Sequence, residues 1–161
     1  MNRYIDKVIL ALQPLKSSRG VKRIVFGNVI VSTEEYPVIL VHPTISRQSQ
    51  EDTDNVNTAR GFGVTVEVFD QTRRIDNGSD VDLNALASNF TKLLEEEVSD
   101  TDPTPKSDTV RRILESTFMK DGDSLLREGL TIEYGNDPET QGVQKAVINL
   151  VLKGSHYQYT L

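Results

Sequence analysis

Few side chains in this sequence are of the types that carry out nucleophilic, acid–base or metal chemistry. The 161 residues include no cysteine and only two histidines, His42 and His156, which most of the chain separates. The lack of cysteine excludes disulfides, thiolate nucleophiles and cysteine-based zinc sites. A lone histidine after a strand is more often a polar residue at a sheet edge than a base or a ligand.

The serines, glycines and carboxylates follow no catalytic or binding motif. No serine lies in a Gly-x-Ser-x-Gly turn, and the Gly61-Phe62-Gly63 segment lacks the third glycine and the following helix of a phosphate-binding loop. Glu51, Asp52 and Asp54 lack the glycine and the final glutamate of a calcium loop. We therefore predict no catalytic residue, no cofactor and no metal site, and we expect that the protein is not an enzyme.

The charge balance limits the classes of partner. The chain has 24 acidic and 18 basic residues and a formal charge of −6. Proteins that grip phosphate backbones need clustered Lys and Arg, whereas Arg73-Arg74 and Arg111-Arg112 are short, isolated pairs. An acidic surface instead suits a soluble protein, or one past which DNA slides without sticking.

No segment predicts a membrane protein. The sequence has no run of about 18–20 apolar residues, the length that spans a bilayer. Its first residues lack a signal-peptide pattern, so we expect the protein to stay where it is made.

Apolar spacing predicts the elements of the first half. A helix from Tyr4 to Leu15 ends at Pro14 and the Ser17–Gly20 run. Strand patterns cover 21–26 and 29–33, joined by a turn at Gly27-Asn28. The apolar run at 36–42 predicts a central strand buried on both faces.

A polar, irregular segment follows at 43–59 and predicts a long loop. Such loops are either mobile surface segments or functional ones. A mobile loop and a partner-binding arm between two long strands remain equal alternatives.

The second half alternates strands and helices. Residues 61–69 predict a strand, and its two glycines mark a bulge or a close approach of backbones. Asp82 then caps a helix at 83–98, and the trio Glu95-Glu96-Glu97 falls near its C-terminus. Negative charge is unfavourable there, which points to a nearby cation.

A connector at 99–107 precedes a helix that Asp108 caps and that carries Val110, Ile113, Leu114 and Phe118 on one face. Strands at 130–134 and 143–153 close the fold. We predict one α+β domain at 1–154, a mostly antiparallel sheet with helices packed on one face, and a C-terminal tail at 155–161.

The order of these segments resembles the tail terminator (tail-completion) proteins of long-tailed bacteriophages. The resemblance covers most of the chain and rests on order and pattern. Its parts are the N-terminal amphipathic helix, the Pro-initiated strand Tyr36–Val41, the alternating strand within Ala59–Phe69, the helix Leu83–Val98, and the closing hairpin of Ile132–Tyr134 and Gln144–Lys153.

The resemblance implies a homo-oligomeric ring, commonly hexameric, that caps the tail tube and stops its polymerisation. Its partners would be the tail tube protein and the head connector or head-closure protein, and DNA would pass through without specific binding. The expected location is the head–tail junction of the virion, after assembly in the host cytoplasm. We expect interface residues in the polar loop and the acidic trio: Arg47, Glu51, Asp52, Asp54, Arg60, Glu95, Glu96 and Glu97.

Three alternatives remain open. The first is another neck protein, such as a head-closure or connector adaptor. The second is a non-viral soluble adaptor or regulator, which predicts an 18.0 kDa monomer. The third is a small-molecule-binding or hydrolytic α+β domain, which predicts a concave pocket with convergent polar groups.

Overall fold

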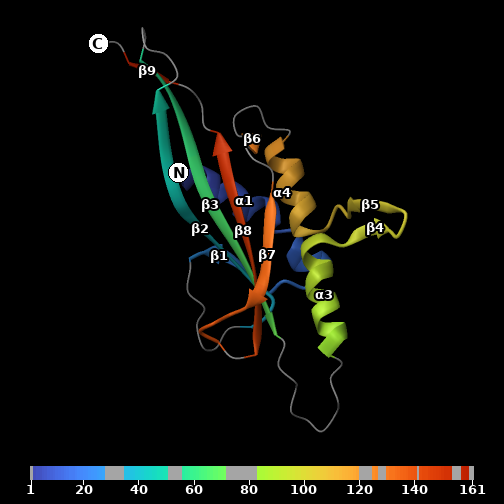
Figure 1. Ribbon diagram of the computed structural model, residues 1–161. Coiled ribbons are helices and arrows are strands. Elements are labelled where there is room, and N and C mark those ends of the chain that lie inside the picture. Colours follow the sequence, from blue (N-terminus) through green and yellow to red (C-terminus); the bar gives the residue numbers. More distant parts are fainter. Residues whose placement is uncertain are drawn as a thin grey trace.

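The computed structural model describes residues 2–27, 35–50, 56–71, 83–119, 125–126, 130–140, 142–153 and 157–159. These ranges contain both helices and strands (Figure 1). The helices are α1 (Asn2–Leu12), α2 (Leu15–Ser18), α3 (Leu83–Glu95) and α4 (Val110–Met119). The strands are β1 (Arg23–Phe26), β2 (Val38–Gln50), β3 (Val56–Gln71), β4 (Glu97–Ser99), β5 (Asp102–Pro105), β6 (Leu125–Leu126), β7 (Thr131–Asn136), β8 (Val143–Lys153) and β9 (Tyr157–Tyr159).

Seven of these strands form one mixed, mostly antiparallel sheet. Its order is β1-β2-β3-β8-β6, with β7 also beside β8 and β9 also beside β3. The β1–β2 pair is parallel, and the other pairs in this sheet are antiparallel. β4 and β5 make a separate two-stranded sheet. The predicted α+β class is therefore confirmed.

The core lies between the helices and one face of the large sheet. Alternate residues of the two central strands, such as Val66 of β3 and Ile148 of β8, are fully buried beneath the helices. The helices contribute Leu12, Phe90 and Phe118 to the same cluster. Burying one such side chain stabilises the fold by roughly 1.5–3 kcal/mol. This face fixes the strand register, because a one-residue slip would turn the apolar residues to the other face.

The predicted loop at 43–59 is wrong for the residues that the structure describes. β2 continues to Gln50 and β3 begins at Val56, and the strands stay paired as far as Gln50 and Thr58. Residues 51–55 lie outside the described ranges. Backbone pairing, which sequence patterns do not report, extends the ribbon beyond the apolar residues. A register shift between Pro43 and Ile45 leaves Thr44 as an extra residue, so the bulge lies on β2 instead of at the glycines of β3.

Two further boundaries differ from the sequence predictions. The predicted tail contains β9, whose three residues pair with β3. α3 ends at Glu95, so Val98 is not on its buried stripe but lies in β4, 50% exposed. The predicted connector at 99–107 therefore contains β5, which pairs with β4 to form a hairpin. The predicted strand at 29–33 and the cap at Asp82 lie outside the described residues.

Candidate interaction surfaces

The β2–β3 ribbon forms an arm that extends past β1 and β8, and β9 pairs with β3 at its outer end (Figure 1). β1 pairs with β2 only as far as Val41, and β8 pairs with β3 only as far as Gly61. Two predicted interface residues belong to this arm. Arg47 lies opposite Gly61, and Arg60 lies opposite Gln48, one position further along. The backbone thus brings these arginine positions together, while Glu51, Asp52 and Asp54 fall outside the described ranges.

The acidic trio is divided among three environments. Glu95 at the end of α3 forms an ion pair with Arg111 of α4, at 2.8 Å between Oε2 and Nη1. Glu96 binds Arg19 at 2.7 Å and Lys106 at 3.1 Å. Glu97 begins β4 and is exposed. The cations expected near the trio therefore come from this chain itself, and among the three carboxylates Glu97 is the one left facing solvent.

A network of charges around Glu96 fixes the root of the β4–β5 hairpin. Arg19 Nη2 also contacts Asp108 Oδ1 at 2.8 Å, and its Nε donates to the Asp108 carbonyl oxygen. The Lys106 N–H donates to the Glu96 carbonyl oxygen at 2.7 Å. Hydrogen bonds from Arg19 and then from Lys106 hold the pKa of Glu96 below its ordinary value. The root is thus tied to α2 and to the start of α4.

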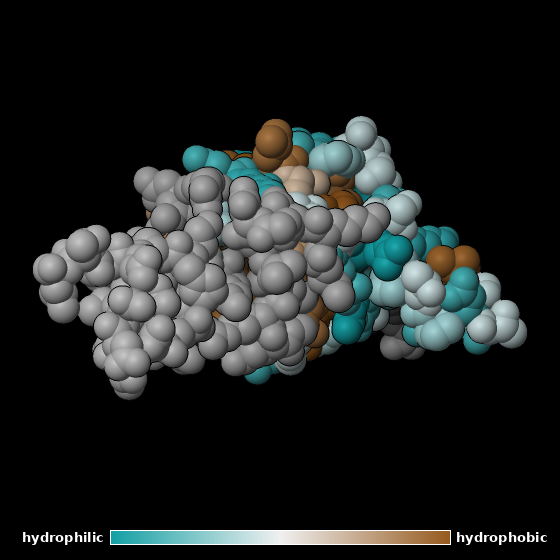
Figure 2. All heavy atoms as spheres, turned by 90° about the horizontal axis from the view of Figure 1, so that it is seen from above, coloured by the Kyte–Doolittle hydropathy of each residue, from teal (hydrophilic) through white to brown (hydrophobic). Residues whose placement is uncertain are grey.

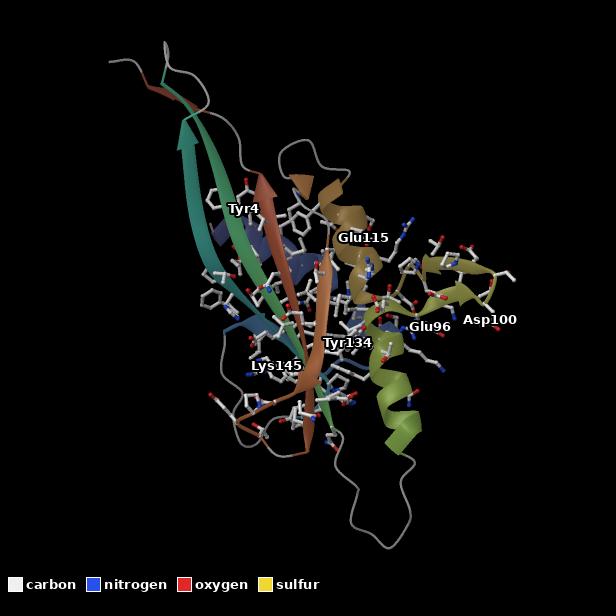
Figure 3. All side chains as sticks on the ribbon, viewed as in Figure 1. Tyr4, Glu96, Asp100, Glu115, Tyr134 and Lys145 are labelled. Atoms are coloured by element: carbon white, nitrogen blue, oxygen red, sulfur yellow. The ribbon has the colours of Figure 1, made fainter. Side chains whose placement is uncertain are left out.

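The β4–β5 hairpin itself projects from the body, with Asp100 at its tip (Figure 3). Residues 97–104 are all exposed. Hydrogen bonds within the hairpin order the tip: the Asp102 N–H donates to Ser99 Oγ, and the Thr104 N–H donates to Asp102 Oδ1. Hydrogen bonds from Thr104 also lower the pKa of Asp102. From above, this right-hand end of the molecule is mainly hydrophilic with one small hydrophobic group (Figure 2).

A hollow of about 380 Å³ lies between α2, α3 and the ends of two strands. It is lined by Ser18, Arg19, Pro37, Asp70, Asn89, Lys92 and Leu93. Lys92 is exposed, and Leu93 is buried. Burial raises the pKa of Asp70, although the Gln71 N–H donates to its carboxylate and opposes that effect. The hollow thus combines an exposed lysine, a buried leucine and a carboxylate that burial partly desolvates.

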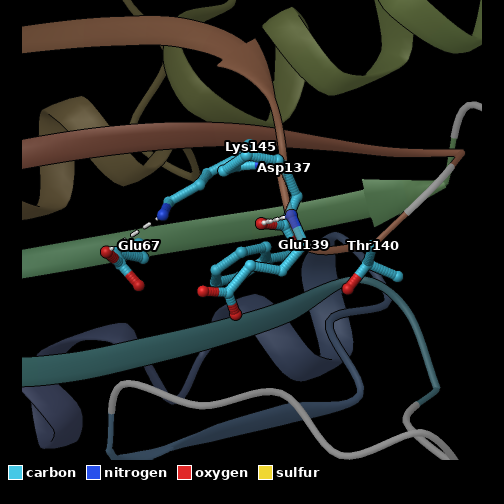
Figure 4. A pocket seen from close by; sticks show the side chains of 7 residues that line it. Glu67, Asp137, Glu139, Thr140 and Lys145 are labelled. Carbon is cyan, nitrogen blue, oxygen red and sulfur yellow. Dashed lines mark hydrogen bonds and ion pairs between the residues drawn. The ribbon is translucent and has the colours of Figure 1, made fainter.

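The face of the sheet away from the helices carries a cluster of charged and polar side chains. Glu67 Oε1 lies 3.4 Å from Lys145 Nζ and 3.6 Å from His42 Nε2. Glu67 and Lys145 line a small depression of about 110 Å³ under the turn that contains Asp137 and Glu139 (Figure 4). His42 is therefore a polar residue of the sheet surface beside a carboxylate.

Sequence reasoning missed the hairpin and its root. Turn chemistry was present in the Ser99–Asp102 segment and its two following prolines, and it was interpreted as a connector. The Arg19–Asp108 contact joins residues 89 positions apart, and no local pattern reports it. The Glu67, Lys145 and His42 group also depends on strand register.

The described residues contain no group of three or more His, Cys, Asp or Glu side chains placed to hold a metal ion. Among the helices of the described ranges, none has the length and apolar character to cross a membrane. The surfaces that stand out are the arm, the hairpin and the hollow. The chain matches no protein-family model and no curated protein.

Proposed function

We propose that this chain is the subunit of a ring, hexameric by analogy with tail terminator proteins, that caps the tail tube of a long-tailed bacteriophage and ends its polymerisation. The proposal starts from the resemblance in segment order to tail terminator proteins. The observation that carries it further is the β2–β3 arm, which leaves a helix-covered antiparallel sheet and extends beyond it. An element of this kind can reach a neighbouring molecule while the body stays folded.

The mechanism we propose is geometric. Contacts between two different surfaces of identical subunits close into a ring when the rotation allows it. One face of this ring would mate with the last layer of the tube and block the next addition, and the other would receive the head connector or head-closure protein. The protein would then lie at the head–tail junction of the virion.

The charge of the chain supports a conduit role. With a formal charge of −6, the ring would repel passing phosphates more than it retains them. DNA would then pass through the ring without specific binding. The polar surfaces found on the described residues suit protein partners on the outside of such a conduit.

Removing the end of the arm tests the proposal. Deleting residues 48–56 leaves the pairs from Val38–Phe69 to Arg47–Gly61 intact, so the chain should still fold. The purified wild type, added to polymerising tail tube protein, should shorten the tubes seen by electron microscopy. The deletion variant should leave their length unchanged.

A matched control changes an exposed site at the opposite end of the sheet. Glu139 lies in the turn between β7 and β8. The Glu139→Ser variant should cap tubes like the wild type. If the folded deletion variant caps tubes as well as the wild type, the arm has no part in the function. If the wild type has no effect on tube length, the terminator proposal fails.

A further inference from the structure

Residues 97–104 of the β4–β5 hairpin are exposed. β4 and β5 pair with each other and with no other described strand. A lone two-stranded hairpin is marginally stable in water. Here the ion pairs of Glu96 with Arg19 and Lys106 hold the root in place. An exposed element whose root is held by ion pairs is suited to contact another molecule.

The hairpin presents an acidic surface with one apolar residue. Its carboxylates are Glu97, Asp100 and Asp102, and no basic residue lies within 97–105. None of the three forms an ion pair with another described residue. Val98, 50% exposed, adds apolar area beside them. The complementary surface would be cationic at its rim and apolar at its floor.

The hollow between α2 and α3 has these properties. Lys92 stands at its rim without an ion pair among the described residues. Lys22 is exposed, and its backbone N–H donates to the carbonyl oxygen of Pro37, which lines the hollow. Leu93 and Pro37 supply apolar surface. Of the residues that line the hollow, Arg19 and Lys92 are cationic and Asp70 is acidic.

The two surfaces lie next to each other on one copy. Arg19 both lines the hollow and binds Glu96 at the hairpin root. Glu96 and Asp108 already balance the Arg19 charge. The attraction for an acidic hairpin would therefore come from the lysines. The root is held outward, which directs the acidic tip away from its own body (Figure 3). The complementary hollow is then available on a second copy.

We infer that the β4–β5 hairpin of one copy docks against the α2–α3 hollow of the next copy. This contact joins two different surfaces, so it repeats from copy to copy and makes a ring when it closes. The inference rests on the ring proposed above and names its subunit contact. Because the attraction is between charges at the rim, association weakens as salt concentration rises.

A charge swap tests the contact. Asp100→Lys and Lys92→Glu each place like charges across the interface, and each should weaken self-association about tenfold, measured by sedimentation velocity over a concentration series. The double variant restores opposite charges and should recover association. Glu139→Lys, on the β7–β8 turn, changes a residue of neither surface. It is the matched control and should associate like the wild type. Failure of the double variant to recover association overturns the contact.

Cross-linking gives an independent readout, since the natural chain has no cysteine. Oxidation of the Asp100→Cys/Lys92→Cys variant should give a ladder of trimers and larger species on a non-reducing gel. Either single-cysteine variant should give dimers at most. A double variant that yields nothing above dimers contradicts the contact.

The cross-link and the tube assay separate the two proposals. A ladder from a chain that does not cap tubes would support the proposed contact and contradict the proposed terminator function. Capping by a chain that forms no ladder would remove the contact and leave the function.

Discussion

Arg19 connects three segments that are distant in the sequence. It follows α2 and binds Glu96 before β4 and Asp108 before α4. Its side chain is 18% exposed, so solvent screens these pairs only in part. The single residue thus sets the position of the hairpin relative to the helices.

Replacing Arg19 with Met should lower the free energy of unfolding by roughly 1–2 kcal/mol, because Glu96 and Asp108 lose a shared charged donor. The chain has no tryptophan, so urea unfolding followed by circular dichroism is the suitable measurement. Lys16→Met, in the neighbouring α2, removes an exposed charge and should change stability by less than about 0.5 kcal/mol. Equal losses in the two variants would contradict the role of Arg19.

Glu96 should make stability depend on acid pH. Its folded-state pKa lies below the ordinary value of 4.5, so the unfolded chain binds the proton first. Its stabilising contribution is complete above that value and is lost as the pH falls through the lower folded-state pKa. Between pH 7 and 3, thermal unfolding of Glu96→Gln should vary less with pH than that of the wild type. Glu139→Gln, an exposed control, should keep the wild-type profile, and a similar profile for both variants would refute this role.

The sequence predicted that cations lie near the acidic trio, but not which residues supply them. The position of Glu95–Glu97 near a helix C-terminus indicated a nearby cation, and Arg111, Arg19 and Lys106 supply it. Which cation pairs with which carboxylate depends on how α2, α3 and α4 pack. Local charge patterns carry no such information.

At the scale of elements, the cap of α4 lies one residue from the predicted position. The sequence predicts Asp108 as the cap, but the side chain at the capping position is Thr109. Thr109 Oγ1 accepts the Arg112 N–H at 3.3 Å and donates to the Lys106 carbonyl oxygen at 2.7 Å. Asp108 instead binds Arg19. Both residue types favour this position, so only the tertiary contact decides between them.

Thr109→Ala should lower the free energy of unfolding by about 1–2 kcal/mol, because it removes the cap and the hydrogen bond from the hydroxyl to the Lys106 carbonyl oxygen. Thr109→Ser keeps the hydroxyl and should recover most of that loss. Denaturant melts of the two variants measure the difference. Similar losses for Ala and Ser would show that packing of the methyl group, and not the cap, stabilises this position.

Strands with one buried face were predictable, and strands without one were not. Apolar alternation located the core of β3 and β8, because one side of each packs beneath the helices. The outer part of β2, the β4–β5 hairpin and β9 depend on backbone pairing and carry polar residues. The parallel β1–β2 pair was also missed, since an apolar run does not report the direction of its neighbour.

At the scale of the whole molecule, the described surface has two projections and a hollow around one helix-covered sheet (Figure 1). The arm and the hairpin leave the body from different elements, so each can meet a different neighbour. We propose that the hairpin joins copies within a ring and that the arm reaches the adjoining layer. The sequence indicated the class of fold, but the arm, the hairpin and the hollow depend on backbone pairing and tertiary contacts that local patterns do not report.

The most direct test of the terminator function is the length of tails made without this chain. Electron microscopy of particles from a virus that lacks the gene should show overlong tail tubes and unjoined heads, because nothing stops tube polymerisation. Supplying the wild-type chain should restore tails of one length. Tails of normal length beside heads that leak DNA would contradict the account and indicate a head-closure or connector adaptor.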